Sequence, residues 1–521
     1  MKRTIRIISV LMCLILLLGL FAGCGKSEKK QEETKKIEGL LKDQDYYLIR
    51  NKASGLVLAA DDYGMINSGK VKMREWDEKE QDMSMVWRVV AVDSSSYRLQ
   101  NMATEDRYMT VKRDGNTNGT LMCLEPFKES DGQIFELEAD EASEDGISYR
   151  VFSRLTDFCV EPQDGISTVD TDVIQNYLPY NKDVDYQVWE FERLGSGDIK
   201  VPQMLSVSGD TQNWSCPEIY NYNGKYYGFI MARGISIKTS DNLREWTKSG
   251  TVFPTTSALA YDWMSNPVTG VENGSIWAPG IYKIGDTYCV YYCISTSGSQ
   301  NSLIGLATNT TLDPKDKDYE WVDRGCVLHS YTGEDYNAID PNVIIDDDGQ
   351  PWLVYGSYWS GIKMRKINPE TLMLDEEDAT RYDLAAAQTR NGPEAGYMIK
   401  HGDYFYLFVA CGSFSTGYWN GVGRSKSVTG PFLDADGNDM LLQGATAVNA
   451  YRDGFTKCGH SSVMTDTDGS QYHVTEYFKT YDDGSSSSSL LGISQICWTE
   501  DGWPVTSTTP GLLDKLGITA E

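Results

Sequence analysis

One pattern recurs five times in the second half of this chain and limits the folds that it can adopt. A short apolar run beside a proline or glycine leads through a glycine turn to an aromatic-rich run, as from Pro341 through Gly349 to Trp352. Two short strands joined by such a turn form a β-hairpin. A unit that repeats roughly every 50 to 65 residues in this way is typical of a propeller blade. The sequence therefore predicts a five-bladed β-propeller over residues 200–515, with copies that begin at Pro217, Pro279, Pro341, Pro393 and Gly459.

A second repeat occupies residues 43–195. It has three units of roughly 50 residues, each too small to bury its own apolar face, which predicts a threefold all-β assembly. Each unit closes with an aromatic strand, around Trp87, Phe135 and Trp189. These closing strands resemble the Gln-x-Trp signature of ricin-type β-trefoil lectins. We therefore expect an all-β protein, with an N-terminal β-trefoil followed by the propeller.

The resemblance to ricin-type lectins implies a sugar site where an acidic residue follows the second strand of a unit. That position holds Ala59, Thr110 and Glu161, so only the third unit retains the acid. Glu161 and the aromatic Tyr177 are therefore the candidate sugar-binding residues of this module. A purely structural role in the trefoil core would explain most of the signature equally well.

The first residues predict export. Three basic residues precede an apolar run from Ile7 to Phe21 that is short for a membrane-spanning helix, as in a secretory signal. Residues 20–24 resemble a bacterial lipobox, which implies removal of a signal peptide (residues 1–23) and a lipid on Cys24. Removal of a plain signal peptide is the alternative. Residues 24–42 have little to bury and are expected to be a disordered tether, which would make this an extracytoplasmic protein, lipid-anchored to the bacterial cell membrane.

Charge narrows the range of partners. The formal net charge of −28 argues against nucleic acid, because binding phosphates requires clustered Lys and Arg, and it also disfavours anionic glycans. A neutral plant cell-wall polysaccharide or oligosaccharide remains compatible. Nine cysteines follow Cys24 without the spacing of a zinc site, and their odd number favours buried thiols over a disulfide framework.

The innermost strand of each propeller blade begins at a central pocket, so the residues beside the repeated prolines should converge there. They are Cys216, Trp277, Asp340, Glu394 and His460. Asp340 and Glu394 come from successive blades, and glycoside hydrolysis requires two such carboxyl groups, an acid for the leaving oxygen and a base for water. The alternative for Asp340 is a residue that begins a strand by bonding its own backbone.

Aromatic residues near these positions offer flat apolar faces to sugar rings. Trp277, Tyr358 and Trp359 are the candidates for binding substrate. Ordinary packing within the blades would explain each of them equally well.

Several motifs between residues 214 and 505 occur in the order of glycoside hydrolase family 43, and they resemble its endo-α-1,5-arabinanases. They are Trp-Ala-Pro from Trp277, Ile-Asp-Pro around Asp340, Glu-Ala at Glu394 and Gly-His at His460. The resemblance implies that Glu394 is the general acid and that Asp340 modulates its pKa. It also implies a calcium near His460 and no other cofactor. The implied activity is inverting hydrolysis of arabinan or a related arabinose- or xylose-containing polysaccharide.

The first blade departs from this family. The family opens that blade with His-Asp-Pro, whose Asp is the general base, whereas this chain has Cys216 in the place of the Asp. A thiol has an ordinary pKa of about 8.5, and burial raises it, so it cannot simply replace a carboxylate. Glu218 lies two residues on, hence on the same face of the strand, and is the candidate substitute besides an unplaced carboxylate. Gly280 and Gly421 also stand where the family commonly has Asp and Arg.

These observations leave two main hypotheses. The first is a surface-anchored glycoside hydrolase that uses Glu394 and Asp340. The second is a catalytically degenerate glycan-binding lipoprotein, which the loss of the base at Cys216 would explain. A propeller that serves as a protein-interaction platform is a third, with no support beyond the versatility of the fold.

Overall fold

The computed structural model describes residues 40–140, 146–166, 168–177, 184–254, 274–386, 392–415, 417–442, 444–481 and 484–518. The predicted signal peptide, the predicted lipidation site Cys24 and most of the predicted tether lie outside these residues. Within them, no helix is both long and apolar enough to cross a bilayer. All nine cysteines after Cys24 are described, and none of them forms a disulfide bond with another described residue.

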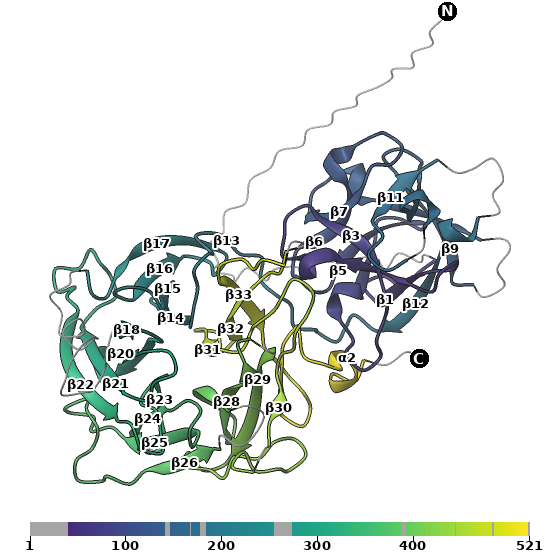
Figure 1. The fold of residues 1–521 in the computed structure, drawn as a ribbon. Helices are drawn as coiled ribbons and strands as arrows, with labels where there is room; N and C mark the ends of the chain where they lie inside the picture. Colours follow the sequence, from purple (N-terminus) through teal and green to yellow (C-terminus); the bar gives the residue numbers. More distant parts are fainter. Residues whose placement is uncertain are drawn as a thin grey trace, which may run out of the picture. The chain divides into compact units, whose positions relative to one another are not determined.

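The N-terminal module is a β-trefoil of three four-stranded units. The first and last strands of the three units pair in the closed cycle β1–β4–β5–β8–β9–β12, which forms a six-stranded barrel. The middle strands form the hairpins β2–β3, β6–β7 and β10–β11. Figure 1 shows these strands in purple to blue. The strands are β1 (Tyr46–Asn51), β2 (Val57–Ala60), β3 (Gly69–Arg74), β4 (Trp87–Ala91), β5 (Ser96–Asn101), β6 (Arg107–Val111), β7 (Met122–Pro126), β8 (Phe135–Ala139), β9 (Ser148–Ser153), β10 (Cys159–Pro162), β11 (Val173–Asn176) and β12 (Val188–Gly195).

The predicted closing aromatics form the centre of this trefoil. Trp87, Phe135 and Trp189 are fully buried in one apolar cluster. The Trp87 indole N–H donates to the Leu58 carbonyl and that of Trp189 to the Val160 carbonyl, each at 2.9 Å. Because a buried indole N–H needs a partner, these bonds fix the two rings against the second strands of their units.

The C-terminal module is a five-bladed propeller. Figure 1 shows the inner strands β14, β23 and β31 near the centre of a ring and the outer strands β17, β22 and β26 at its rim. The blades are β13 (Ser208–Gly209) with β14 (Glu218–Tyr222), β15 (Lys225–Ile230), β16 (Ser236–Ser240) and β17 (Glu245–Thr251); β18 (Ser275–Ile276) with β19 (Gly280–Ile284), β20 (Thr287–Ser295), β21 (Ser302–Asn309) and β22 (Val322–Ser330); β23 (Asn342–Ile345) with β24 (Pro351–Tyr355), β25 (Ile362–Lys366) and β26 (Tyr382–Ala385); β27 (Glu394–His401) with β28 (Tyr404–Ser413), β29 (Gly417–Ser425) and β30 (Thr446–Ala447); and β31 (Ser461–Thr465) with β32 (Gln471–Tyr477) and β33 (Leu490–Gln495).

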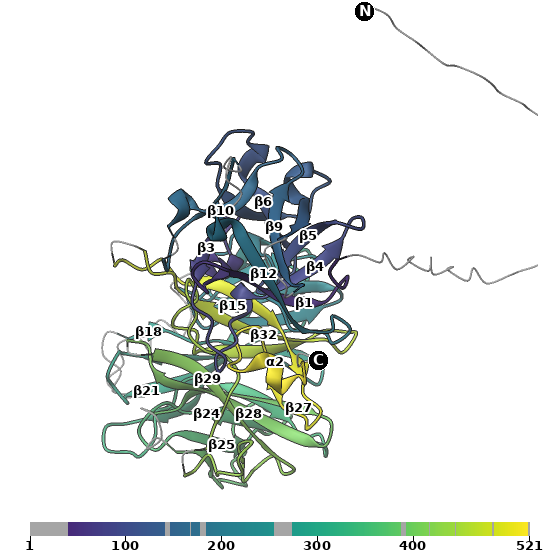
Figure 2. The same ribbon diagram turned by 90° about the vertical axis from the view of Figure 1, so that its right-hand side faces the viewer.

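The segment that leads into β14 closes the ring. Met204 and Gln212 form antiparallel bridges with Ser494 and Leu490, at the outer strand β33 of the fifth blade. The last described elements are the hairpin β34 (Cys497–Trp498) with β35 (Pro504–Val505) and the short helix α2 (Leu512–Lys515), which is yellow in Figure 2. Closure by a distant segment satisfies a sheet edge that would otherwise be open.

The entrances of three inner strands share an uncommon backbone conformation. Cys216, Asp340 and Ala395 have φ of 47°, 55° and 51°, in the left-handed region. Such conformations cost L residues about 1–2 kcal/mol and concentrate at functional sites. The matching geometry in three blades indicates that it orients the side chains at the pocket.

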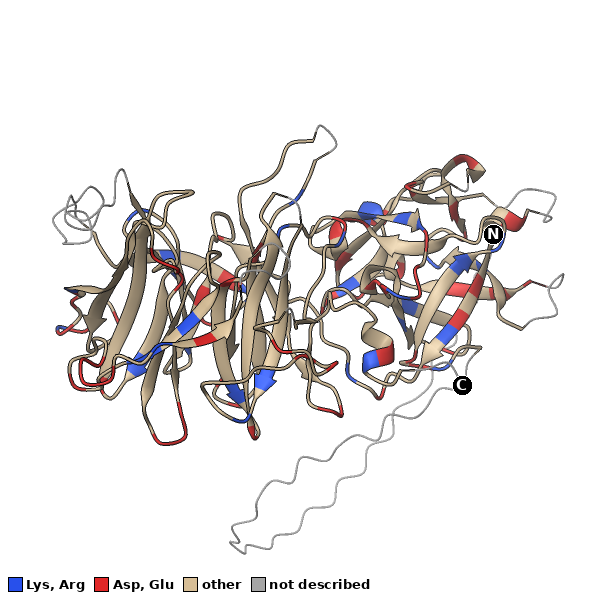
Figure 3. Cartoon of the chain, turned by 60° about the horizontal axis from the view of Figure 1, so that its bottom comes forward, with Lys and Arg blue, Asp and Glu red and all other residues tan. Residues whose placement is uncertain are grey.

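Charge is dispersed over the described surface. Figure 3 shows Asp and Glu spread along strands and loops with Lys and Arg between them. The full sequence has 75 acidic and 47 basic residues, so the overall field is negative. A negative field favours uncharged polymers over anionic ones.

Candidate active site

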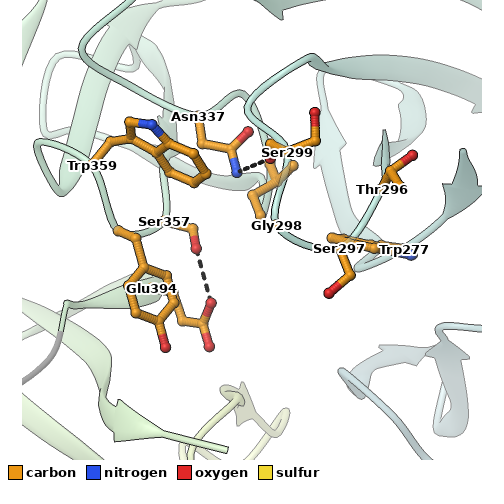
Figure 4. Close-up of a pocket in the computed structure, with 11 residues that line it drawn as sticks. Trp277, Thr296, Ser297, Gly298, Ser299, Asn337, Ser357, Trp359 and Glu394 are labelled. Atoms are coloured by element: carbon orange, nitrogen blue, oxygen red, sulfur yellow. Dashed lines mark hydrogen bonds between the residues drawn. The ribbon is translucent and has the colours of Figure 1, made fainter. Parts of the chain in front are cut away.

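A cavity of about 500 Å³ opens where the inner strands of the second, third and fourth blades begin. Its walls are the loop Thr296 to Ser299 after β20, the loop Ser357 to Trp359 after β24, and the side chains of Trp277, Asn337 and Glu394. Figure 4 shows Trp359 and Glu394 on one side of this cavity and Ser297 and Trp277 on the other. The volume and the mixture of aromatic and polar walls suit a small sugar unit.

Glu394 is the only carboxylate that lines this cavity among the described residues. It is the first residue of β27, next to an irregularity in the pairing of β27 with β28. The Tyr418 hydroxyl donates to its Oε1 at 2.6 Å, and the Ser357 hydroxyl donates to its Oε2 at 2.9 Å. Figure 4 shows the second of these bonds. Two hydroxyl donors hold the carboxyl group in one orientation at the wall of the cavity.

Asp340 lies behind Glu394, and only 8% of its surface is exposed. Its Oδ2 accepts a hydrogen bond of 3.2 Å from the backbone N–H of Ala395, the residue that follows Glu394. Burial, and then the charge of Glu394, raise the pKa of Asp340 well above its usual value, although the Ala395 N–H opposes the rise. The structure thus brings the two predicted carboxyl groups together, and the charge of Glu394 disfavours ionisation of Asp340.

The three predicted aromatic residues all line the cavity. Trp277 is fixed by its indole N–H, which donates to Ser275 Oγ at 2.7 Å. Tyr358 and Trp359 form a strained turn with φ of 47° and 37°, and the Tyr358 N–H donates to the Pro393 carbonyl at 3.1 Å. Trp359 is 40% exposed, which leaves its face open to a ligand.

Cys216 lies close to the acid pair but does not line the large cavity. Burial, followed by the charges of Glu476 and Asp340, raises the pKa of its thiol well above the usual value. Its sulfur contacts the Met231 sulfur at 3.9 Å. The thiol is therefore neutral at neutral pH and cannot accept a proton from water.

The structure places Glu218, the predicted substitute base, away from the large cavity. It lines a second cavity of about 440 Å³, formed by residues further along the inner strands. Its Oε2 accepts from the Ile281 N–H at 2.9 Å and its Oε1 from the Tyr397 hydroxyl at 3.1 Å. Burial raises the pKa of Glu218 to about 8, with these hydrogen bonds opposing the rise. Glu218 is therefore mostly protonated at neutral pH. Besides the second cavity it lines a narrow space together with Cys216 and Asp340, but it does not line the cavity that contains Glu394.

His460 lines a narrow space of about 20 Å³ together with Cys216 and Asp340. Burial lowers the pKa of His460 to about 4, so the imidazole is neutral at neutral pH. Among the described residues, no three His, Cys, Asp or Glu side chains are grouped so that they could hold a metal ion. The calcium near His460 stays a prediction.

Close packing explains the two glycines at positions that commonly carry polar residues. A Cβ on Gly280 would lie 2.6 Å from the Pro341 carbonyl oxygen. A Cβ on Gly421 would lie 2.7 Å from the Ala445 Cβ and 3.2 Å from the Cys411 sulfur. Neither position has room for a longer side chain in this backbone.

Three residues of the site escaped the sequence analysis. Tyr418 and Ser357 are the two donors to Glu394, and Glu476 supplies the first charge that acts on Cys216. Glu476 could have been noticed in the sequence, because a carboxylate there occupies the next position of an alternating apolar pattern, after Tyr472 and Val474. Nothing in the local sequence distinguishes Tyr418 or Ser357 from ordinary strand and loop residues.

The trefoil residues Glu161 and Tyr177 also lie together. Glu161 is almost fully buried, and it accepts hydrogen bonds from the side-chain amides of Asn176, at 2.5 Å, and Gln187. Tyr177 follows Asn176, is 61% exposed and packs against Phe158 with 4.4 Å between ring centroids. The carboxylate thus holds the strand end that presents an exposed aromatic face.

Comparison with known families gives two matches along the chain. The profile of glycosyl hydrolases family 43 matches residues 210–504, which is more than half of the chain. The profile described as a ricin-type β-trefoil lectin domain-like family matches residues 37–125. The first match contains the whole cavity, and the second covers the first unit and most of the second unit of the trefoil.

Individual relatives agree with the first match. An extracellular exo-α-(1→5)-L-arabinofuranosidase of Cellvibrio japonicus is 33% identical over 294 residues, 54% of this chain and 82% of the relative. An extracellular endo-α-(1→5)-L-arabinanase of Bacillus subtilis is 33% identical over 282 residues, 53% of this chain and 81% of the relative. The solved structure of an α-L-arabinanase of Cellvibrio cellulosa complexed with arabinohexaose superposes with a TM-score of 0.52 at 30% identity, covering 60% of this chain and 99% of that one.

Proposed function

Because the chain belongs to family 43 of the glycosyl hydrolases, we propose that it cleaves α-1,5-linked L-arabinofuranosyl units of arabinan by acid–base hydrolysis. The observation that carries the proposal is Glu394, held by two hydroxyl donors at the wall of an aromatic cavity with Asp340 behind it. The exo-acting and endo-acting relatives both act on α-1,5 linkages, which supports this linkage without deciding between the two modes.

In this mechanism Glu394 protonates the glycosidic oxygen as the bond to the anomeric carbon breaks. A water molecule attacks the opposite face of the sugar, which inverts the configuration. Asp340 changes the electrostatic environment of Glu394 through their mutual repulsion and does not touch the substrate. Trp277 and Trp359 provide apolar faces for the sugar rings.

Release of reducing sugar from debranched arabinan tests this function. Glu394→Gln keeps the shape of the side chain and an oxygen that can accept from Tyr418 or Ser357, but it cannot donate a proton as an acid. We expect kcat to fall about 10²–10⁴-fold, the usual contribution of a general acid. Glu245→Gln, an exposed position on β17, should leave the rate unchanged. Equal background rates for the wild-type protein and Glu394→Gln would contradict the hydrolase.

That outcome would favour the second candidate, a degenerate propeller that binds arabinan without cleaving it. The neutral thiol at Cys216 is the observation in its favour, because the carboxylate expected at this position is missing. Saturable binding of arabino-oligosaccharides, measured by calorimetry with no product formed, would identify this alternative.

We also propose that the trefoil binds glycan through its third unit. Glu161 positions Asn176 and the exposed Tyr177, and the corresponding positions Ala59 and Thr110 lack a carboxylate. An exposed aromatic ring beside fixed polar groups is a common way to hold a sugar ring.

The basic and apolar N-terminus supports a further proposal, export followed by attachment of a lipid to Cys24. Mass spectrometry of the membrane fraction would then find a diacylated Cys24 as the first residue. An unmodified N-terminus, or cleavage elsewhere, would contradict the anchor.

A further inference from the structure

The proposed hydrolase still requires a group that removes a proton from water. Cys216 cannot supply it, because its thiol is neutral. Glu218 cannot supply it either, because it is largely protonated and lines the other cavity. A base must therefore come from an element outside the first inner strand.

The fifth blade contributes a third carboxyl group at the pocket end of the propeller. Glu476 lies near the end of β32, and Thr475 beside it pairs with Ser461 at the start of β31. This register places Glu476 level with the start of β31. Its side chain is only 5% exposed.

Strand alternation directs the Glu476 side chain toward the first blade. Val474, two residues earlier on the same face of β32, packs in one apolar cluster with Trp214 and Ile219. Trp214 immediately precedes Ser215 and Cys216. The face of β32 that carries Glu476 is therefore the face that covers the Cys216 position.

Groups of the first and fourth blades act on Glu476. Ser215, the residue before Cys216, favours the ionised form of the Glu476 carboxyl group, and Ser215 Oγ lies 2.9 Å from Ser489 Oγ. Among the titratable groups, Glu394 acts on Glu476, and Glu476 supplies the first of the charges that act on Cys216. Three carboxyl groups and the thiol thus form one electrostatic cluster.

From this cluster we propose that Glu476, reaching over from the fifth blade, is the general base of the reaction in place of the residue at Cys216. The inference rests on the proposed hydrolase function. Glu476 accepts one proton from the attacking water while the water oxygen bonds to the anomeric carbon. The bond from that carbon to the glycosidic oxygen breaks, and the oxygen takes the proton of Glu394. Exchange with solvent returns Glu394 to its acid form and Glu476 to its carboxylate.

The protonation behaviour of Glu476 suits this role. Burial raises its pKa to about 7, the Ser215 hydroxyl opposes the rise, and the charge of Glu394 adds to it. A general base is most effective when its pKa lies near the working pH. Because the base must be ionised, kcat/KM should rise with pH through about 7.

The test compares Glu476→Gln with the wild-type protein on debranched arabinan and on an aryl arabinofuranoside. We expect kcat to fall about 10²–10⁴-fold and the rise in kcat/KM near neutral pH to disappear. Azide needs no base, so it should restore the rate on the aryl substrate and yield a glycosyl azide of inverted configuration. Glu394→Gln should lose arabinan cleavage without recovery by azide, because the leaving oxygen still lacks a proton.

Each contrary result has a distinct meaning. A wild-type protein that is inactive on both substrates overturns the hydrolase and the base together. If the wild-type protein is active and the rate of Glu476→Gln stays within about threefold of it, the assignment of the base is overturned while the hydrolase stands. A loss of rate in Glu218→Gln instead of Glu476→Gln has the same meaning. If Glu476→Gln does not fold, Glu476→Asp decides the question, with an expected loss of about tenfold and acceleration by azide. A folded Asp variant with the wild-type rate and no azide response overturns the proposal.

Discussion

At the scale of residues, the site concentrates carboxyl groups whose protonation depends on burial and on each other. Asp340 has a pKa well above its usual value because it is buried, and the neighbouring Glu394 charge adds to this. Burying an ionised carboxylate costs free energy that a neutral group avoids. Burial of Asp340 therefore lowers the stability of the fold, and it defines the electrostatic environment around Glu394.

The raised pKa of Asp340 predicts how the melting temperature of Asp340→Asn compares with that of the wild-type protein at different pH values. An acidic group whose pKa is higher in the folded state than in the unfolded state contributes to the stability of the fold. This contribution is fully present when the pH is below the unfolded-state pKa, and it is lost as the pH rises through the folded-state pKa. The asparagine cannot ionise, and its oxygen can still accept from the Ala395 N–H. We expect equal melting temperatures near pH 5 and an advantage of about 1–3 °C for Asp340→Asn at pH 8, together with lower kcat.

Thermal unfolding by circular dichroism between pH 5 and pH 8 measures this difference. Asp348→Asn is the matched control, because Asp348 is exposed in a turn of the same blade, and its effect should not change with pH. A constant difference between wild type and Asp340→Asn across this range would show that Asp340 ionises normally.

The convergence of Asp340 and Glu394 could be predicted from sequence and the position of Glu476 could not, for a physical reason. Asp340 and Glu394 stand where inner strands begin, beside Pro341 and Pro393, so a repeat count alone brings them to one pocket. Glu476 instead belongs to a second strand, and its charge acts on Cys216 only because β32 packs on the first blade. That neighbour relation depends on ring closure, which no local pattern encodes.

At the scale of elements, the loop between β24 and β25 shapes the aromatic wall. Gly361 ends this loop with φ of 90°, and its N–H donates to the Tyr358 carbonyl at 2.6 Å. The Ser360 N–H donates to the Asp335 carbonyl at 2.9 Å. A Cβ on Gly361 would lie 2.0 Å from the Ala385 carbonyl oxygen of β26. The loop therefore packs against the outer strand with no space for a side chain.

We expect Gly361→Ala to displace this loop and with it Tyr358 and Trp359. The clash adds to a cost of about 1–2 kcal/mol for a left-handed alanine. KM for arabino-oligosaccharides should rise, and the melting temperature should fall. Gly349→Ala is the matched control, because its φ of 81° imposes similar strain while its Cβ would meet no atom within 4 Å. Kinetics and melting curves that do not distinguish the two variants would contradict this role of the loop.

The order of the strands could also be predicted from the sequence, because two short strands joined by a glycine turn mark each hairpin. The inner hairpins of the blades follow the predicted repeats, as β23 and β24 do around Gly349. The bridges of Met204 and Gln212 to the fifth blade were not predicted. They join residues almost 300 positions apart through isolated pairs, and such short pairings leave no periodic pattern to detect.

At the scale of the whole molecule, two modules that recognise the same polymer would act together. A second binding event on one chain is intramolecular, so it raises the avidity for a long polysaccharide without any new contact. A short oligosaccharide occupies one site at a time and gains nothing. The trefoil should therefore matter for polymeric arabinan and be irrelevant for arabinotriose.

Tyr177→Ala tests this difference, because its side chain is exposed and its loss leaves the Glu161 hydrogen bonds intact. We expect KM for soluble arabinan to rise about 3- to 10-fold while kcat/KM for arabinotriose stays unchanged. Phe127→Ala is the matched control, since Phe127 follows β7 as Tyr177 follows β11, is 52% exposed, and belongs to the unit with Thr110 in place of the acid. Parallel kinetics on the two substrates measure both variants. If Phe127→Ala weakened the use of polymer as much as Tyr177→Ala, the effect would come from exposed aromatic surface in general and not from a glycan site built by Glu161.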